Sequence, residues 1–109
     1  MPTVYITQET ANRNFLPARK YGSLKPLMPG NAQVVLSTSP TLRKLRFGLK
    51  NFTDEDYLLL SGDPIIMGLA IVVALEKTNG KARFLKWDKH ESDYYDVQLD
   101  LYEKGEEYV

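Results

Sequence analysis

The chain has 109 residues, of which 43% are hydrophobic, and its formal net charge is zero at pH 7. This length fits one domain with one hydrophobic core, so it excludes enzymes that need separate cofactor and substrate domains. The absence of cysteine excludes disulfides, thiolate nucleophiles and cysteine zinc sites. We expect one α/β domain over residues 1–109 without a cofactor or a metal, and a loose acidic tail at residues 103–109.

The charges are distributed unevenly along the chain. Residues 1–50 carry eight basic residues and one acidic residue, whereas residues 51–109 carry six basic and thirteen acidic residues. The net charges of the two halves are therefore +7 and −7. Such an asymmetry indicates either a charged partner or two halves that interleave, so that the charges mix on the surface.

The first third of the chain predicts little regular structure. The β-branched and aromatic run Val4–Ile6 predicts a strand. Residues 9–31 contain scattered prolines and glycines, and they predict an irregular connection with one short helix near residues 15–21. The apolar run over residues 33–37 predicts the second strand.

Two helices follow, and each begins where a capping residue precedes proline. Ser39 before Pro40 predicts a helix to about Lys50, with Leu42, Leu45 and Leu49 facing the core. Asp63 before Pro64 predicts a helix to about Thr78, ended by Asn79-Gly80. This second helix is apolar nearly all round, and its eleven-residue apolar run (residues 65–75) is shorter than the about 20 residues that a membrane span needs.

The remaining strands complete the expected fold. The continuous apolar run 57–60 is typical of a buried parallel strand. Residues 82–87 and 97–101 predict two further strands joined through a hairpin connection at residues 88–93. Alternating strands and helices predict a small two-layer or three-layer, Rossmann-like α/β domain, whose mostly parallel sheet ends in a C-terminal antiparallel hairpin.

Polar residues follow several of the predicted strands, which makes the strand ends a candidate ligand site. In open α/β sheets, ligands bind at the carboxyl ends of the strands, and helix N-termini there attract anions. We expect the two strand-to-helix junctions to lie side by side at this edge. Helix capping alone is the alternative reading. The candidate residues are Thr7, Gln8, Ser37, Thr38, Ser39, Ser61, Gly62 and Asp63.

The sequence offers little that points to catalysis. The single histidine, His90, lies in the predicted hairpin turn, where a catalytic histidine would lack both a partner and a pocket. The acidic triplet at residues 54–56 fits a solvated connection better than a metal site. No Gly-x-Ser-x-Gly motif surrounds Ser61, and no phosphate-binding Gly-x-x-x-x-Gly-Lys motif is present.

Two sets of residues predict binding surfaces. The first set is a possible basic face for an acidic partner or, less favoured, for nucleic acid: Arg13, Arg19, Lys20, Arg43, Lys44 and Arg46. The second set lies on the apolar helix. A sheet can cover only about half of the surface of this helix, so either residues 9–31 or a second subunit must cover the other half. Its members are Ile65, Ile66, Leu69 and Val73.

Two resemblances add to this reading. The segment Leu59–Pro64, followed by Gly68, is similar to the Gly-Asp-Pro loop of tetrapyrrole methylases, which implies contact with S-adenosylmethionine. The family's glycine- and proline-rich first loop is absent after Ile6. The segments 5–10, 14–17 and 56–64 resemble small proteins of tailed bacteriophages, which implies an accessory or host-interaction protein in the host cytoplasm.

Taken together, these patterns favour an interaction protein without catalytic activity. We expect it to be cytoplasmic, because the N-terminal segment lacks the features of a signal peptide. It would self-associate, with a homodimer favoured, and bind an acidic protein partner. The alternatives are a small-ligand or nucleotide binder that uses the strand ends and, third, a nucleic-acid binder. No membrane partner is expected.

Overall fold

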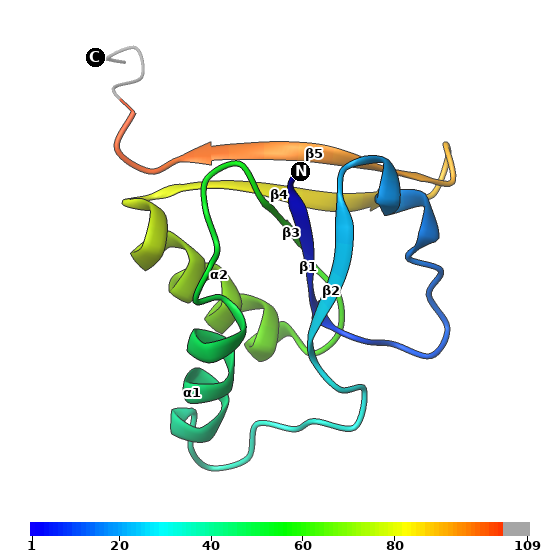
Figure 1. Ribbon diagram of the computed structural model, residues 1–109. Coiled ribbons are helices and arrows are strands. Elements are labelled where there is room, and N and C mark those ends of the chain that lie inside the picture. The colour runs from blue at the N-terminus through cyan, green and yellow to red at the C-terminus, as the bar shows by residue number, and fades with distance from the viewer. Residues whose placement is uncertain (104–109) are drawn as a thin grey trace, which may run out of the picture.

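Five strands, two α-helices and one 3₁₀ helix make up residues 1–103, the part of the chain that the computed structural model describes. The sheet has the strand order β2-β1-β3-β4-β5; neighbouring strands are parallel except for the antiparallel hairpin β4-β5 (Figure 1). The elements are β1 (Thr3–Gln8), η1 (Leu16–Lys20), β2 (Ser23–Met28), α1 (Ser39–Gly48), β3 (Tyr57–Leu59), α2 (Pro64–Thr78), β4 (Lys81–Asp88) and β5 (Asp93–Asp100).

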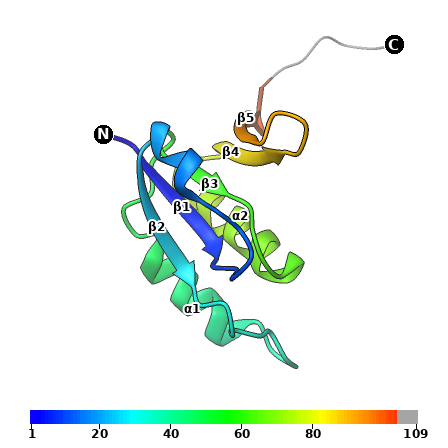
Figure 2. The same ribbon diagram turned by 90° about the vertical axis from the view of Figure 1, so that its right-hand side faces the viewer.

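The two faces of the sheet are covered unequally. Both α-helices lie on one face, whereas the short 3₁₀ helix η1 lies on the other (Figures 1 and 2). The mixed α/β class and the C-terminal antiparallel hairpin are confirmed. The likeness to Rossmann-like domains stays a prediction, and the expected tail beyond residue 103 lies outside the described residues.

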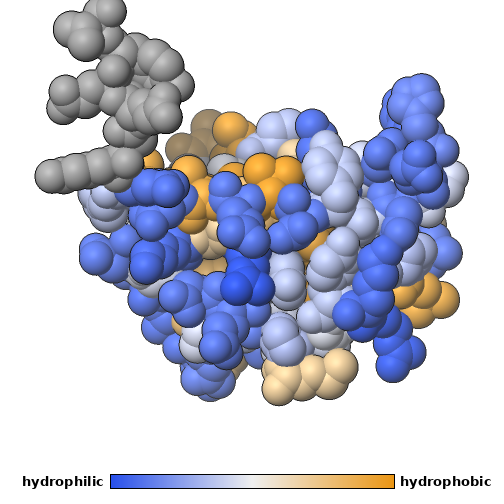
Figure 3. Space-filling model, turned by 90° about the horizontal axis from the view of Figure 1, so that it is seen from above, coloured by the Kyte–Doolittle hydropathy of each residue, from blue (hydrophilic) through white to orange (hydrophobic). Residues whose placement is uncertain are grey.

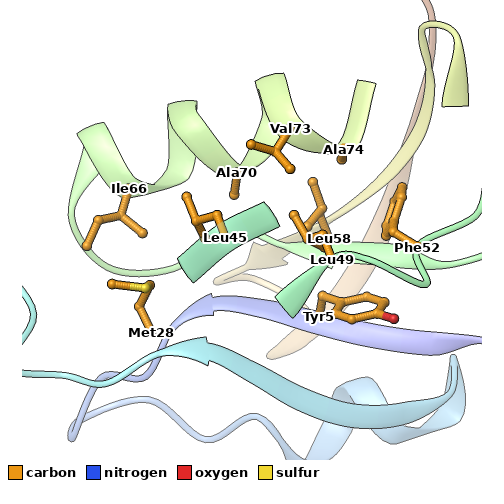
Figure 4. Close-up of a cluster of buried hydrophobic side chains, with 10 residues drawn as sticks. All are labelled: Tyr5, Met28, Leu45, Leu49, Phe52, Leu58, Ile66, Ala70, Val73 and Ala74. Carbon is orange, nitrogen blue, oxygen red and sulfur yellow. The ribbon is translucent and has the colours of Figure 1, made fainter. Parts of the chain in front are cut away.

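The larger core lies between the α-helices and the sheet. Leu45 of α1 and Leu49, the C-cap of this helix, meet the inner side of α2 and the sheet residues Tyr5 and Leu58 (Figure 4). Their spacing of four places both leucines on one face of α1, as predicted, and both are fully buried. Leu42 is only partly buried at the rim of this cluster.

The smaller core lies under η1, on the opposite face. It is built from Val4, Ile6, Ala18, Leu59, Leu85 and Tyr94. Tyr94 packs edge-on against Trp87 with a ring-centre distance of 4.9 Å, and its hydroxyl group donates to the carbonyl oxygen of Asn14 at 3.3 Å. Burial raises the pKa of Tyr94 above its ordinary value. Residues 9–22 therefore pack on the face opposite to α2.

The predicted ends of α2 are confirmed. Asp63 is the N-cap, and its side chain accepts a hydrogen bond from the backbone N–H of Ile65 at 2.7 Å. Asn79 adopts the left-handed conformation (φ 55°) after the last turn, and the N–H of Gly80 donates to the carbonyl oxygen of Leu75. These features are local, so the sequence reveals them.

The second strand is not where the sequence places it. Residues 33–37 are a loop, in which Val35 and Leu36 are exposed, and residues 23–28 form β2 instead. The strand contains Pro26, which has no N–H to donate to a sheet. β2 tolerates this proline because it is an edge strand, paired on one side only, with β1. The expectation that residues 23–28 are irregular was therefore wrong, whereas residues 29–31 lie outside the strand, as expected.

The start of α1 also differs in detail from the prediction. Thr38, not Ser39, is the N-cap, and it makes no capping hydrogen bond through its side chain. Ser39 is the first residue of the helix, and Pro40 follows it within the first turn. The proline still marks the start of the helix, because its fixed φ suits the first turn.

The surface over the β4-β5 hairpin is mostly hydrophilic. Seen from the side of β5, its hydrophobic residues form small spots separated by hydrophilic ones (Figure 3). None of the helices within residues 1–103 has the length and hydropathy needed to cross a lipid bilayer.

Candidate functional site

The carboxyl ends of β1 and β3 are joined by a reciprocal pair of hydrogen bonds. Thr7 Oγ1 donates to the carbonyl oxygen of Ser61 at 2.6 Å and accepts from the N–H of Ser61 at 2.9 Å. Thr7 is fully buried and Ser61 almost so. The pair therefore satisfies both backbone groups of Ser61 in a place that water does not reach.

The side chain of Gln8 links the end of β1 to two other segments by hydrogen bonds. Its side-chain amide donates to the carbonyl oxygens of Pro29 and Ala32, both at 3.0 Å, and its Oε1 accepts from the N–H of Asp63 at 2.7 Å. Gly62 is required beside it, because its φ is +95° and an added Cβ would lie 2.3 Å from Gln8 Oε1. We call Thr7, Gln8, Ser61, Gly62 and Asp63 the strand-end clamp.

The polar groups of the strand-end clamp form hydrogen bonds with other groups of the protein. Asp63 caps α2, and every buried side-chain nitrogen and oxygen in residues 1–103 has a hydrogen-bond partner. The structure thus brings together five of the eight predicted ligand-site residues and gives each of them a structural role. Whether they also touch a ligand stays a prediction.

The other three predicted ligand-site residues lie elsewhere. Ser37 and Thr38 are exposed at the end of the connection from β2 to α1, and Ser39 is exposed as the first residue of α1. The hydroxyl group of Ser37 accepts from the N–H of Ser39 at 3.3 Å, and no hydrogen bond within the described residues joins these three to the strand-end clamp. Because residues 33–37 are not a strand, Ser37 does not mark a strand end.

The predicted basic residues form two groups instead of one face. Arg13, Arg19 and Lys20 belong to the segment on the η1 side of the sheet, whereas Arg43, Lys44 and Arg46 belong to α1 on the other side (Figures 1 and 2). Lys20 pairs with Asp93, whose pKa this hydrogen bond lowers, and Arg46 pairs with Glu76 at 3.6 Å. Arg43 and Lys44 form no ion pair within residues 1–103.

An open groove between β2 and α1 contains the unpaired basic residues of α1. Its volume is about 470 Å³, and Lys25, Arg43, Lys44 and Phe47 line it. Phe47 is 70% exposed, and the Lys50 ammonium lies 4.3 Å from the centre of its ring. We call this the basic groove. The sequence did not indicate that Lys25 belongs to it, because β2 was not predicted.

A second cavity, also not predicted, lies at the carboxyl end of β1 on the η1 side. Its volume is about 590 Å³. Apolar side chains form most of its wall, and Glu9, Thr10 and Arg13 supply polar groups. We call it the β1 cavity, and its apolar lining includes Ile6, Phe15, Leu16, Leu24 and Pro26.

The four residues predicted for self-association fall on both sides of α2. Ile66 and Val73 are buried in the larger core, so they cannot contact a second subunit in this fold. Ile65 is 54% exposed and Leu69 partly exposed. Val72, which the sequence did not single out, is 53% exposed. The orientation of α2 about its own axis, as it packs on the sheet, decides which of these residues are buried and which are exposed.

The acidic triplet is mainly a structural feature. Asp56 accepts from the N–H groups of Thr3 and Thr53, both at 2.9 Å, and so ties the connection before β3 to the start of β1. His90 lies in the β4-β5 turn, as predicted, where its backbone N–H donates to Asp88. Among residues 1–103, no three His, Asp or Glu side chains come close enough to hold a metal ion together.

Comparison with models of protein families identifies the family of this chain. A family model described as "Phage Pam3 gp32-like protein" matches residues 2–101. No curated protein and no solved structure matches the chain. No resemblance to tetrapyrrole methylases is shown, whereas the predicted resemblance to a small phage protein is confirmed.

Proposed function

This chain belongs to the phage Pam3 gp32-like family, and we propose that it is an accessory protein that acts by binding protein chains, including copies of itself. The observation that carries this proposal is the outer side of α2. From Pro64 to Leu75 the helix contains no charged or polar side chain. A helix that packs on a sheet normally presents polar residues to water, and exposed apolar patches mark interaction sites.

No other segment of the described chain covers this surface. Phe15 and Leu24, which could have covered α2, pack against the smaller core on the opposite face of the sheet. Leu27 reaches the larger core only at its margin, and Leu16 is exposed. α1 packs beside α2 and leaves Ile65 and Val72 accessible.

A second copy of the chain is the occupant that fits this surface best. The exposed positions Ile65, Gly68 and Val72 lie along one side of α2, and nothing lies within 4 Å of where a Cβ on Gly68 would be. A twofold axis near Gly68 would place Ile65 of one copy against Val72 of the other without burying an unpaired charge. A single helix face offers on the order of a few hundred Å² per copy, so we expect a weak, micromolar dimer.

Light scattering coupled to size exclusion tests this dimer. We expect the wild-type protein to approach the dimer mass at high micromolar concentration, and Val72→Asp to remain a folded monomer. Val97→Asp is the matched control, because Val97 is also about half exposed (43%) but lies on β5. A monomeric wild-type protein, or an equal effect of both substitutions, would contradict the proposal.

The basic groove supports a second binding function, the capture of an acidic protein segment. Arg43 and Lys44 have no ion-pair partner within the described residues, and Lys25 of β2 lines the same groove. Exposed Phe47 adds apolar contact area beside these charges. An acidic peptide with an apolar residue fits this combination. Nucleic acid is the alternative, because bases stack on aromatic rings within basic grooves.

Anisotropy measurements with labelled polyglutamate and labelled single-stranded DNA distinguish the two ligands. We expect polyglutamate to bind at low salt and the double variant Arg43→Glu/Lys44→Glu to lose this binding. Lys20→Glu is the matched control, since Lys20 lies outside the groove and is already paired. Preferential binding of DNA, with a steep decrease of affinity as salt is added, would favour the nucleic-acid function instead.

A further inference from the structure

The β1 cavity lies over β1 and β2, next to the place where open α/β sheets bind their ligands. β1 and β3 are neighbours, and the segments that follow them leave toward opposite faces: residues 9–15 toward η1, and residues 60–64 toward α2 (Figure 2). Where the segments after two adjacent parallel strands leave toward opposite faces, a crevice opens at the carboxyl ends of these strands. Open α/β sheets bind their ligands in this crevice. The strand-end clamp fills the α2 side of this crevice. The β1 cavity lies beside the crevice on the η1 side, where β1, β2 and residues 9–16 line it.

Hydrogen bonds hold the polar wall of the cavity in place. Arg13 Nη1 donates to the carbonyl oxygen of Leu60 at 3.2 Å, and the hydroxyl groups of Thr10 and Ser61 lie 3.3 Å apart. On the other side, the N–H of Glu9 donates to the carbonyl oxygen of Met28 at 3.0 Å. The segment 9–13 is therefore fixed to the ends of both neighbouring strands, and hydrogen bonds within the protein hold the wall of the cavity in place.

The lining defines the chemistry of a ligand. Buried Ile6 and partly buried Phe15 and Leu24 provide an apolar surface, and about 590 Å³ is within the range of small-molecule sites. Within residues 1–103, Arg13 is the only basic residue of the lining, and it forms no ion pair there. Only one of its five N–H donors has a partner there, which leaves others for an anionic group.

Glu9 sets a limit on the charge of the ligand. Glu9 belongs to the lining of the same cavity, and its carboxylate forms no ion pair with Arg13. A ligand with several negative charges, such as a nucleotide, would be repelled by Glu9, whereas one anionic group can lie next to Arg13. We propose that the β1 cavity binds a small organic anion with an apolar body and a single charged group, which Arg13 holds.

Fluorescence titration with anilinonaphthalene sulfonate tests this proposal, because the probe is an apolar aromatic body with one anionic group. We expect saturable binding to the wild-type protein and a decrease in affinity of about ten-fold or more for Arg13→Met, from loss of a charge-assisted interaction. Ala11→Trp fills the cavity from an exposed position and should abolish binding. Glu9→Gln should raise the affinity.

Two controls separate this site from other apolar surfaces. Phenylnaphthylamine has the same apolar body without the sulfonate, and we expect its binding to be insensitive to Arg13→Met. Val72→Asp alters the exposed side of α2, the other surface to which the probe could bind, and should leave the β1 cavity signal intact. Absence of probe binding, or binding that Val72→Asp abolishes and Arg13→Met leaves unchanged, would overturn the proposal. The effect of Arg13→Met is independent of the dimer and of the basic groove, because Arg13 belongs to neither surface.

Discussion

Replacing Val73 by aspartate is expected to unfold the protein, whereas the same replacement at Val72 is expected to leave the fold intact. The two valines are neighbours in the sequence, but Val73 is 2% exposed and Val72 is 53% exposed. Val73 points from α2 into the larger core, among Leu45, Leu49 and Leu58 (Figure 4). An unpaired carboxylate there costs several kcal/mol, which is comparable to the about 5–15 kcal/mol that stabilises a domain.

Far-UV circular dichroism and urea unfolding measure this difference. Val72→Asp should change the free energy of unfolding of the monomer by no more than about 0.5 kcal/mol, as is usual for surface substitutions. Val73→Ala provides a milder comparison at the buried position, with an expected cost of about 1–3 kcal/mol from lost apolar contacts. A folded Val73→Asp variant with wild-type stability would show that the register of α2 on the sheet differs from the one described.

Thr7→Val is expected to lower the free energy of unfolding by about 2–4 kcal/mol, because it leaves two buried backbone groups of Ser61 without partners. The hydroxyl group of Thr7 both donates to the carbonyl oxygen and accepts from the N–H of Ser61. Valine has nearly the same shape, so the change removes these hydrogen bonds and little packing. Urea unfolding followed by tryptophan fluorescence measures the loss.

Two substitutions calibrate this effect. Thr7→Ser keeps the hydroxyl group and should cost only about 1 kcal/mol for the lost methyl group. Asp63→Ala removes the N-cap of α2 and should also cost about 1 kcal/mol. If Thr7→Val or Asp63→Ala leaves stability unchanged but abolishes binding of a small molecule, the strand-end clamp is a ligand site as well as a structural feature.

The sequence was most informative where a few adjacent residues determine the structure. Asp63 before Pro64 predicted the start of α2, and Asn79-Gly80 predicted its end, because capping depends on local hydrogen bonds and backbone angles. The apolar run 57–60 predicted a buried strand, and β3 lies inside the sheet, between β1 and β4. The family resemblance was also confirmed.

The position of β2 could not be read from the sequence. Residues 33–37 have the β-branched composition of a strand, whereas residues 23–28 include Pro26. Only the pairing with β1, from Thr3 with Ser23 to Gln8 with Met28, shows which segment enters the sheet. Strand pairing joins residues distant in the chain, and an edge position tolerates a residue that cannot donate a hydrogen bond.

For the candidate sites too, some features follow from the sequence and others only from the tertiary structure. The sequence by itself determined which residue types are present: an apolar helix, a basic first half, and polar residues after β1 and β3. The tertiary structure decided that Ile66 and Val73 face inward, that the basic residues lie on both sides of the sheet, and that Arg13 lines a cavity. These features depend on packing between segments far apart in the chain, whereas the sequence pattern describes only neighbours within one segment.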